Sequence, residues 1–140
     1  MKILVINGPN LNRLGERDPL IYGGKGWTDI EKKIKTEYPT IDFDFFQSDS
    51  EEQVIEKLSL ANKNYNGIVF NPGAYSHYSV AIRDAVELLQ IPIIEVHLSN
   101  ISGRDSFRKN LITASRARGY IAGFKENSYL AAVYVLRKIL

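Results

Sequence analysis

The chain contains no cysteine, only two histidines, one methionine and one tryptophan among its 140 residues. The absence of cysteine excludes disulfides, thiolate metal sites and cysteine nucleophiles. It also fits a reducing compartment, so we expect the protein to be cytoplasmic. No apolar run is long enough to span a bilayer, and the chain enters a predicted strand at once. We therefore expect neither a transmembrane helix nor a signal peptide.

The charge balance is also slight, because 18 basic and 16 acidic residues leave a net charge of +2. So small an excess does not indicate a nucleic acid or an anionic membrane as partner. A composition that is 44% hydrophobic and 24% charged is that of an ordinary globular protein. The length suits one domain, which we place at residues 1–140.

Five apolar segments predict β-strands. Short runs rich in β-branched or aromatic residues are typical of strands that are buried on both faces. The second segment alternates at first between apolar and acidic residues, which indicates an edge strand. The five segments are residues 3–6, 41–46, 68–70, 92–98 and 120–124.

Helical patterns separate the strands. Thr28 with Glu31 and Ser50 with Gln53 have the spacing of capping boxes, which predicts that helices begin there. A third helix is predicted from Ser79 onward, and a last one is capped by Asn127 or Ser128 and runs to Leu140. Residues 99–118 are predicted to be mostly loop, with one short helix near Phe107.

The alternation of strands and helices predicts the fold. It is typical of a parallel sheet with helices on both faces and right-handed crossovers. Five such units favour an α/β, flavodoxin-like three-layer sandwich with strand order 2-1-3-4-5. The first and third strands are neighbours in this order, so the polar segments that follow them, residues 7–22 and 71–77, should face each other across one crevice.

The polar residues at these strand ends indicate a binding site. Asn10 and Asn71 follow the first and third strands, and the only two histidines, His77 and His97, come just after apolar strands. Histidine titrates nearest neutral pH and is the usual proton donor or acceptor. Either histidine alone could equally well fill a loop or cap a helix. Together, these residues favour a site for a small polar, anionic ligand.

Tyr22 and Arg17 lie in the long loop after the first strand, before the glycine-rich run at residues 23–26. This run is a plausible hinge, which would make the loop a lid. A tyrosine phenol ordinarily ionises near pH 10 and could act as a base at neutral pH only beside a cation. Arg17 is a candidate for that cation. The alternatives are a solvated arginine and a tyrosine that packs beneath the loop.

Other kinds of site fit less well. The glycine-rich run lacks the spacing of a phosphate-binding loop, and no dinucleotide fingerprint follows the first strand. A receiver domain would carry acidic residues where this chain has Asn7 and Asn71. Two histidines on different strands without a carboxylate cluster are poor evidence for a metal, so we expect none.

The motifs in register resemble those of one family, the type II 3-dehydroquinate dehydratases. The match begins with Asn7-Gly8-Pro9-Asn10-Leu11-Asn12, Arg17, Pro19 and Tyr22-Gly23. It continues with Asn71-Pro72-Gly73-Ala74-Tyr75-Ser76-His77, Ser79 to Ala85, Glu95-Val96-His97-Leu98-Ser99-Asn100-Ile101, Arg104 and Phe107-Arg108. It spans nearly the whole chain, and several independent motifs in order are far more specific than any one of them.

The resemblance implies a reaction. Members of this family are carbon–oxygen lyases of the shikimate pathway, which leads to chorismate and the aromatic amino acids. They convert 3-dehydroquinate to 3-dehydroshikimate by loss of water through an enolate, without cofactor, metal or Schiff base. By position, Tyr22 would be the base, and Arg17 would favour its phenolate. Asn10 would hold a water on the enolate oxygen, and His97 would be the acid, oriented by Asn71.

The resemblance also implies how substrate is held. The backbone amides of Leu98 and Ser99 would bind its carboxylate, while His77 and Arg108 would bind ring hydroxyls. Glu95 would support the site from beneath, and Asp84 would enter from a neighbouring subunit. The family assembles as a dodecamer, a tetramer of trimers, which we expect here as well.

The chain departs from the family pattern in a few places. Ser102-Gly103 and Lys109-Asn110 replace the usual histidine-containing pairs, and Lys125 replaces a usual glycine. Two other classes of function are compatible with the strand-end pattern alone. One is a non-catalytic flavodoxin-like binding module, such as a flavin carrier, and the other is a structural interaction protein.

Overall fold

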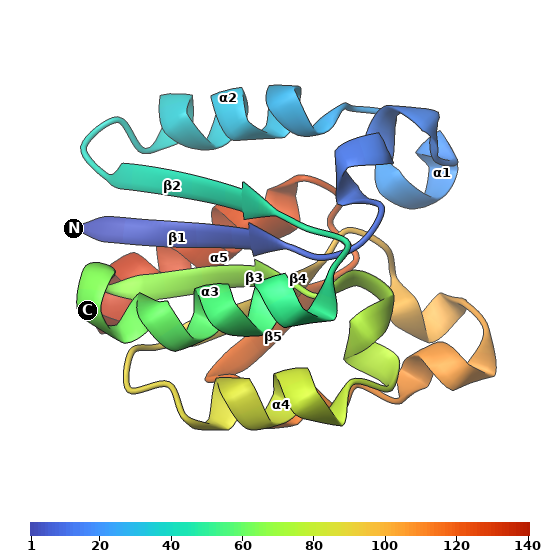
Figure 1. The fold of residues 1–140 in the computed structure, drawn as a ribbon. Coiled ribbons are helices and arrows are strands. Elements are labelled where there is room, and N and C mark those ends of the chain that lie inside the picture. The colour runs from blue at the N-terminus through green and yellow to red at the C-terminus, as the bar shows by residue number, and fades with distance from the viewer.

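The computed structural model describes all 140 residues and contains one parallel sheet. The strands lie in the order β2-β1-β3-β4-β5, and every neighbouring pair is parallel, which confirms the predicted order (Figure 1). Their bounds are β1 (Lys2–Asn7), β2 (Asp42–Gln47), β3 (Gly67–Asn71), β4 (Ile93–His97) and β5 (Gly119–Ala122).

Four long helices cover the two faces of the sheet, as expected for a three-layer sandwich (Figure 1). Alternate residues of β1 point to opposite faces. Ile3 and Val5 pack with α2 (Trp27–Glu37) and α5 (Asn127–Ile139), whereas Leu4 and Ile6 pack with the helices of the other face. The helices of that second face are α3 (Glu51–Asn64) and α4 (Val80–Glu87).

Short helical segments replace much of the predicted loop structure. The loop after β1 contains a 3-10 helix, η1 (Leu11–Glu16), and one turn of α-helix, α1 (Pro19–Tyr22). Leu11 and Leu14 are buried, and this apolar pair draws a polar segment into regular structure. Three 3-10 helices occupy the stretch where one was expected, and one of them, η4 (Ser106–Lys109), contains Phe107. The other two are η3 (Ile101–Gly103) and η5 (Ala114–Arg116).

Two of the predicted helix starts are wrong. The α2 helix begins at Trp27, before Thr28, and its capping residue Gly26 makes no side-chain hydrogen bond. The start is displaced because the Trp27 ring packs against Phe45 and Tyr129, with ring centroids 6.0 and 5.2 Å away.

The start of α5 is the second error, since Glu126 precedes the helix and makes no side-chain cap. The Ser128 hydroxyl accepts instead from the Phe124 amide, at 3.2 Å. The Ser50 cap is confirmed, because its hydroxyl accepts from the Gln53 amide at 3.3 Å. Ser79 caps α4 in the same way.

No helix in the structure is long and apolar enough to cross a bilayer.

Candidate active site

A cavity of about 150 Å³ opens at the carboxyl edge of the sheet, beyond the ends of β1, β3 and β4. Nine of the residues predicted for the site line it: Asn10, Arg17, Tyr22, Asn71, His77, His97, Leu98, Ser99 and Arg108. A larger hollow of about 490 Å³ lies near the opposite ends of the strands, around Pro92 and Leu140. Because it contains none of these residues, the smaller cavity is the candidate active site.

Two tight turns meet at the floor of the cavity. The Gly8 amide donates to the Asn71 carbonyl at 2.7 Å, which joins the turn after β1 to the turn after β3. A Cβ atom at Gly8 would lie 2.4 Å from the Pro72 oxygen, so only glycine permits this approach. The segment after Asn71 continues as a 3-10 helix, η2 (Gly73–His77). Asn10 and Asn71 thereby line the same cavity, although 61 residues separate them.

Asn10 adopts a left-handed backbone conformation, with φ of 66°. Asparagine tolerates this region better than most residues. Its backbone amide donates to the Asp49 carboxylate at 3.1 Å, which ties the start of the loop after β1 to the segment after β2. The conformation and the tether together fix where Asn10 meets the cavity.

Arg17 and Tyr22 form a tight pair on the lid. Asp18 caps α1 by accepting from the Leu20 amide at 2.9 Å, and the helix ends with Tyr22, which is buried. The Arg17 guanidinium donates to the Tyr22 hydroxyl, and its Cζ atom lies 3.7 Å from the ring centroid. The sequence-based expectation that the two residues are neighbours is confirmed.

Arg17 is partly desolvated. Burial lowers its pKa from the ordinary range, and the nearby charges of Arg104 and Arg108 act in the same direction, while Tyr22 opposes them. A guanidinium nonetheless remains charged at neutral pH. The Tyr22 hydroxyl and ring therefore lie against a cation that water screens poorly.

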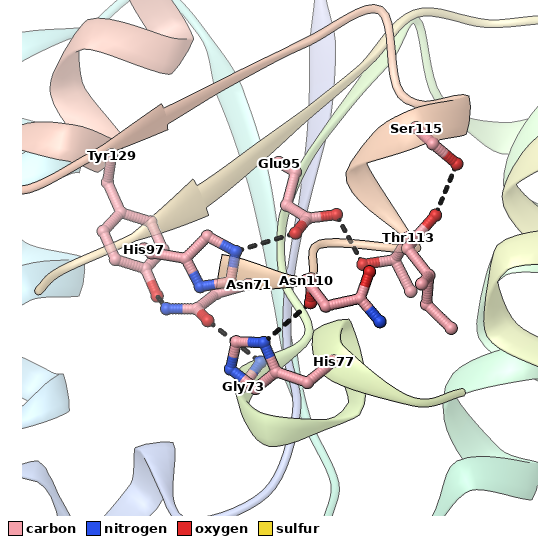
Figure 2. Close-up of polar contacts among 10 residues, drawn as sticks. Asn71, Gly73, His77, Glu95, His97, Asn110, Thr113, Ser115 and Tyr129 are labelled. Atoms are coloured by element: carbon pink, nitrogen blue, oxygen red, sulfur yellow. Dashed lines mark hydrogen bonds and ion pairs between the residues drawn. The ribbon is translucent and has the colours of Figure 1, made fainter. Parts of the chain in front are cut away.

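His97 lies at the end of β4 and is held by a buried carboxylate (Figure 2). Its Nε2 atom lies 2.7 Å from Glu95 Oε1, and the Thr113 hydroxyl donates to Glu95 Oε2, also at 2.7 Å. All three residues are buried. Glu95 can only accept at Nε2, so Nε2 carries a proton and Nδ1 is the nitrogen not engaged by Glu95. Thr113 fixes the carboxylate and thereby the ring.

Asn71 is fixed by contacts other than the expected one (Figure 2). Its Nδ2 atom donates to the Tyr129 hydroxyl at 2.9 Å, and its Oδ1 atom accepts from the Gly73 amide at 3.1 Å. The Tyr129 hydroxyl in turn donates to Asn7 Oδ1 at 2.8 Å. The Asn71 amide is thus held by Tyr129 and Gly73, while Glu95 holds the histidine, and the orientation of His97 by Asn71 stays a prediction.

His77 borders the cavity from η2. Its Nδ1 atom lies 3.0 Å from the Asn110 carbonyl, and since a carbonyl only accepts, Nδ1 carries the proton (Figure 2). Burial lowers the pKa of His77 below its ordinary value, although the Asn110 carbonyl opposes the shift. The ring is thus neutral at pH 7, with Nε2 able to accept a hydrogen bond from a ligand.

Two arginines complete the wall between β4 and β5. Arg108 pairs with Asp105 at 3.3 Å, and Arg104 donates to the Ser99 hydroxyl at 3.3 Å. Arg104 also approaches the Tyr22 ring, with Cζ 5.4 Å from its centroid. The cavity therefore contains three guanidinium groups, from Arg17, Arg104 and Arg108, which suits an anionic ligand.

Asp84 is the predicted site residue that lies apart. It is on α4 and pairs with the adjacent Arg83 at 2.7 Å, and it does not line the cavity of its own chain. Sequence reasoning in turn gave no role to Arg104, Thr113 or Tyr129. Tyr129 could have been noticed as a hydroxyl on the apolar face of α5, whereas no local pattern distinguishes Thr113.

Known proteins resemble this chain over its full length. The family model described as "Dehydroquinase class II" matches residues 1–137. A "3-dehydroquinate dehydratase" of Clostridium botulinum (strain Hall) is 48% identical, covering 99% of this chain and 96% of its own. A protein of the same name from Pelodictyon phaeoclathratiforme is 46% identical, covering 97% of this chain and 91% of its own.

Solved structures agree with these matches. The type II dehydroquinase of Butyrivibrio crossotus superposes with a TM-score of 0.95 at 42% identity, covering 98% of this chain and 97% of its own. That of Propionibacterium acnes gives a TM-score of 0.90 at 39% identity, with 97% and 96% covered. The fold, the cavity and these likenesses lead to one conclusion: the chain belongs to the class II dehydroquinase family.

Proposed function

We infer that this protein is a type II 3-dehydroquinate dehydratase, a hydro-lyase of the shikimate pathway. It removes water from 3-dehydroquinate and releases 3-dehydroshikimate. The observation that carries this inference is that Tyr22, paired with Arg17, and His97, paired with Glu95, line one cavity of about 150 Å³. Family membership supplies the identity of the substrate.

The reaction begins at the lid. The Tyr22 phenolate, stabilised by Arg17, removes a proton from C2 of the substrate, and the electron pair moves onto the neighbouring carbonyl to form an enolate. A water held by Asn10 donates a hydrogen bond to the enolate oxygen, which is an oxyanion-type role. The side-chain geometry supports Tyr22 as the base, because Arg17 contacts its hydroxyl and its ring directly.

The second step takes place at His97. The enolate collapses, the C1–O bond breaks, and His97 protonates the departing hydroxyl so that it leaves as water. Glu95 stabilises the protonated imidazole, because its carboxylate lies 2.7 Å from Nε2. Tyr22 then releases its proton to solvent and His97 takes up a proton from solvent, which returns the enzyme to its starting state.

Substrate is held by residues on three elements. The backbone amides of Leu98 and Ser99 bind its carboxylate, while His77, Arg108 and Asn71 bind its ring oxygens. Asp84 enters from a neighbouring subunit of a dodecamer built as a tetramer of trimers, which accords with its exposed position outside the cavity of its own chain. The chemistry requires no cofactor and no metal, and it takes place in the cytoplasm.

The test is direct. Purified protein mixed with 3-dehydroquinate should produce the ultraviolet absorbance of a conjugated enone, and the activity should survive borohydride added with substrate, because no imine forms. Absence of the signal at high enzyme concentration would reject the proposal. Loss of activity specifically with borohydride and substrate together would instead indicate Schiff-base chemistry.

A further inference from the structure

Lys125 occupies an unusual backbone position in the turn between β5 and α5. Its φ is 53°, and Asn10 is the only other residue besides glycine with positive φ. A lysine gains nothing locally from this conformation, which costs free energy for a side chain with a Cβ atom. Such outliers persist where surrounding contacts maintain them and often indicate a functional constraint.

The contacts of its side chain lead to the lid. Lys125 Nζ donates to the carbonyl oxygens of Leu20 and Ile21, the second at 3.0 Å. Both carbonyls belong to α1, the helical turn that ends at Tyr22. The last carbonyls of a helix lack partners within it, and a lysine is well suited to supply the missing donors. A charged donor makes each of these bonds stronger than a neutral one would.

The same turn also holds the hinge after α1. A Cβ atom at Gly23 would lie 3.1 Å from the Lys125 Cβ atom, so the lysine stem packs directly on this glycine. The neighbouring Glu126 forms ion pairs with Lys25 at 3.5 Å and with Lys33 of α2 at 3.3 Å. The lid, residues 17–26, is thus tethered at α1 by Lys125 and within its glycine-rich hinge by Glu126.

We propose that Lys125 is a positioning residue that holds the lid over the cavity, so that Arg17 and Tyr22 are in place before substrate binds. It acts through the backbone of α1 and touches neither of the two side chains nor the ligand. Its role in turnover depends on the function proposed for Tyr22, whereas its hold on the lid does not.

Loss of the ammonium should affect apparent affinity more than turnover. If fewer molecules have a closed lid, the apparent dissociation constant rises in inverse proportion to the closed fraction. Saturating substrate still draws the lid shut. KM should therefore rise by about 2- to 10-fold, while kcat should change little.

Three variants test the proposal. Lys125→Met keeps most of the stem but removes the ammonium, and Lys125→Gly removes the side chain and also relaxes the backbone. Both should raise KM as stated. In the ligand-free protein, trypsin should cut after Arg17 and Lys25 faster by up to about tenfold, since cleavage follows the open population. Lys32→Met is the control, because Lys32 is exposed on α2 and its side chain forms no hydrogen bond or ion pair. It should leave both readouts unchanged.

The outcomes separate the possible explanations. Wild-type KM and wild-type trypsin cleavage in Lys125→Met would overturn the proposal. So would a rise in KM in Lys125→Met that is absent in Lys125→Gly, since the effect would then come from the strained backbone. If the wild-type protein fails to convert 3-dehydroquinate, the proposed function fails, while the trypsin comparison still decides whether Lys125 holds the lid.

Discussion

The Arg17 guanidinium both donates a hydrogen bond to the Tyr22 hydroxyl and lies over the Tyr22 ring, with Cζ 3.7 Å from its centroid. Two contacts to one aromatic side chain fix the direction of the phenol oxygen as well as its electrostatic surroundings. Both partners lie within one short stretch of chain, residues 17–22, and the Tyr22 ring packs in the core. A substitution that keeps the ring, such as Tyr22→Phe, therefore removes the hydroxyl and leaves this packing in place.

We expect Tyr22→Phe to lose nearly all turnover and to keep its fold. The phenol oxygen is the proposed base, and loss of such a group costs about 10² to 10⁴-fold. The rate of enone formation measures the effect, and circular dichroism verifies the fold. Tyr134→Phe is the control, since Tyr134 is exposed on α5, contacts Lys138 and does not line the cavity. Full activity in Tyr22→Phe would remove Tyr22 from the mechanism.

Glu95→Gln should reduce kcat by at least about 100-fold. The amide nearly preserves the shape of the carboxylate but removes the negative charge that stabilises a protonated His97. Steady-state kinetics should show the loss in kcat rather than in KM, because the proposed ligand contacts do not involve Glu95. Thr113→Val keeps the charge and removes only its other partner, so it should be less damaging. Equal losses in the two variants would contradict a role for the charge.

Gly8→Ala should destabilise the protein by about 1 to 3 kcal/mol, the usual cost of overpacking. The added methyl group would lie 2.4 Å from the Pro72 oxygen and force the two turns apart. Urea denaturation measures the loss. Gly15→Ala is a matched control, since a Cβ atom there has no neighbour within 4 Å. It should change the free energy of unfolding by less than about 1 kcal/mol. Similar losses at both positions would refute the close-approach explanation.

Tyr65 should make stability depend on alkaline pH. Its hydroxyl donates to Asp44 at 2.7 Å, and burial, with a contribution from this bond, raises the pKa of Tyr65 from 10.0 to about 12. The folded state thus binds the proton more tightly than the unfolded state. The resulting stabilisation is complete below pH 10.0 and is lost as the pH rises through about 12.

The comparison with Tyr65→Phe isolates this contribution. The variant should be less stable than wild type by about 1 kcal/mol at neutral pH, as for loss of one hydrogen bond. The difference in free energy of unfolding should then shrink between pH 10.0 and about 12. Urea midpoints across that range provide the measurement, with the exposed Tyr120→Phe as control. A constant difference across the range would exclude the titration of Tyr65 as its source.

The sheet order was predictable because its causes are local. Apolar runs such as residues 3–6 and 68–70 are too short for helices and buried on both faces, and their alternation with helices leaves few possible topologies. The helix starts at Ser50 and Ser79 were predictable for the same reason, since each cap lies within a few residues. Thr28 misled because Trp27 packs against residues that are distant in the sequence.

The site was predictable as a set of residues but not as a network. Strand ends and the resemblance to a family identified Arg17, Tyr22 and His97. The partners of Asn71 were not predictable, since Tyr129 reaches it from α5 across 58 residues. Thr113 likewise becomes part of the network only because the folded chain brings its hydroxyl to the Glu95 carboxylate on β4. Hydrogen bonds between distant segments leave no periodic trace in a sequence, and family resemblance does not supply them.

The junction between the turns after β1 and β3 makes one side of the cavity more rigid than the lid. Gly8 is bonded to Asn71 and pressed against Pro72, so these turns form a rigid seat. An incoming molecule meets these turns in their final shape, whereas the lid that Lys125 holds over the cavity is the part that can open. The conformational entropy that the protein loses on association then comes from the lid and not from these turns. Selection for tighter or looser binding can therefore act on the lid alone and leave the turns after β1 and β3 unaltered.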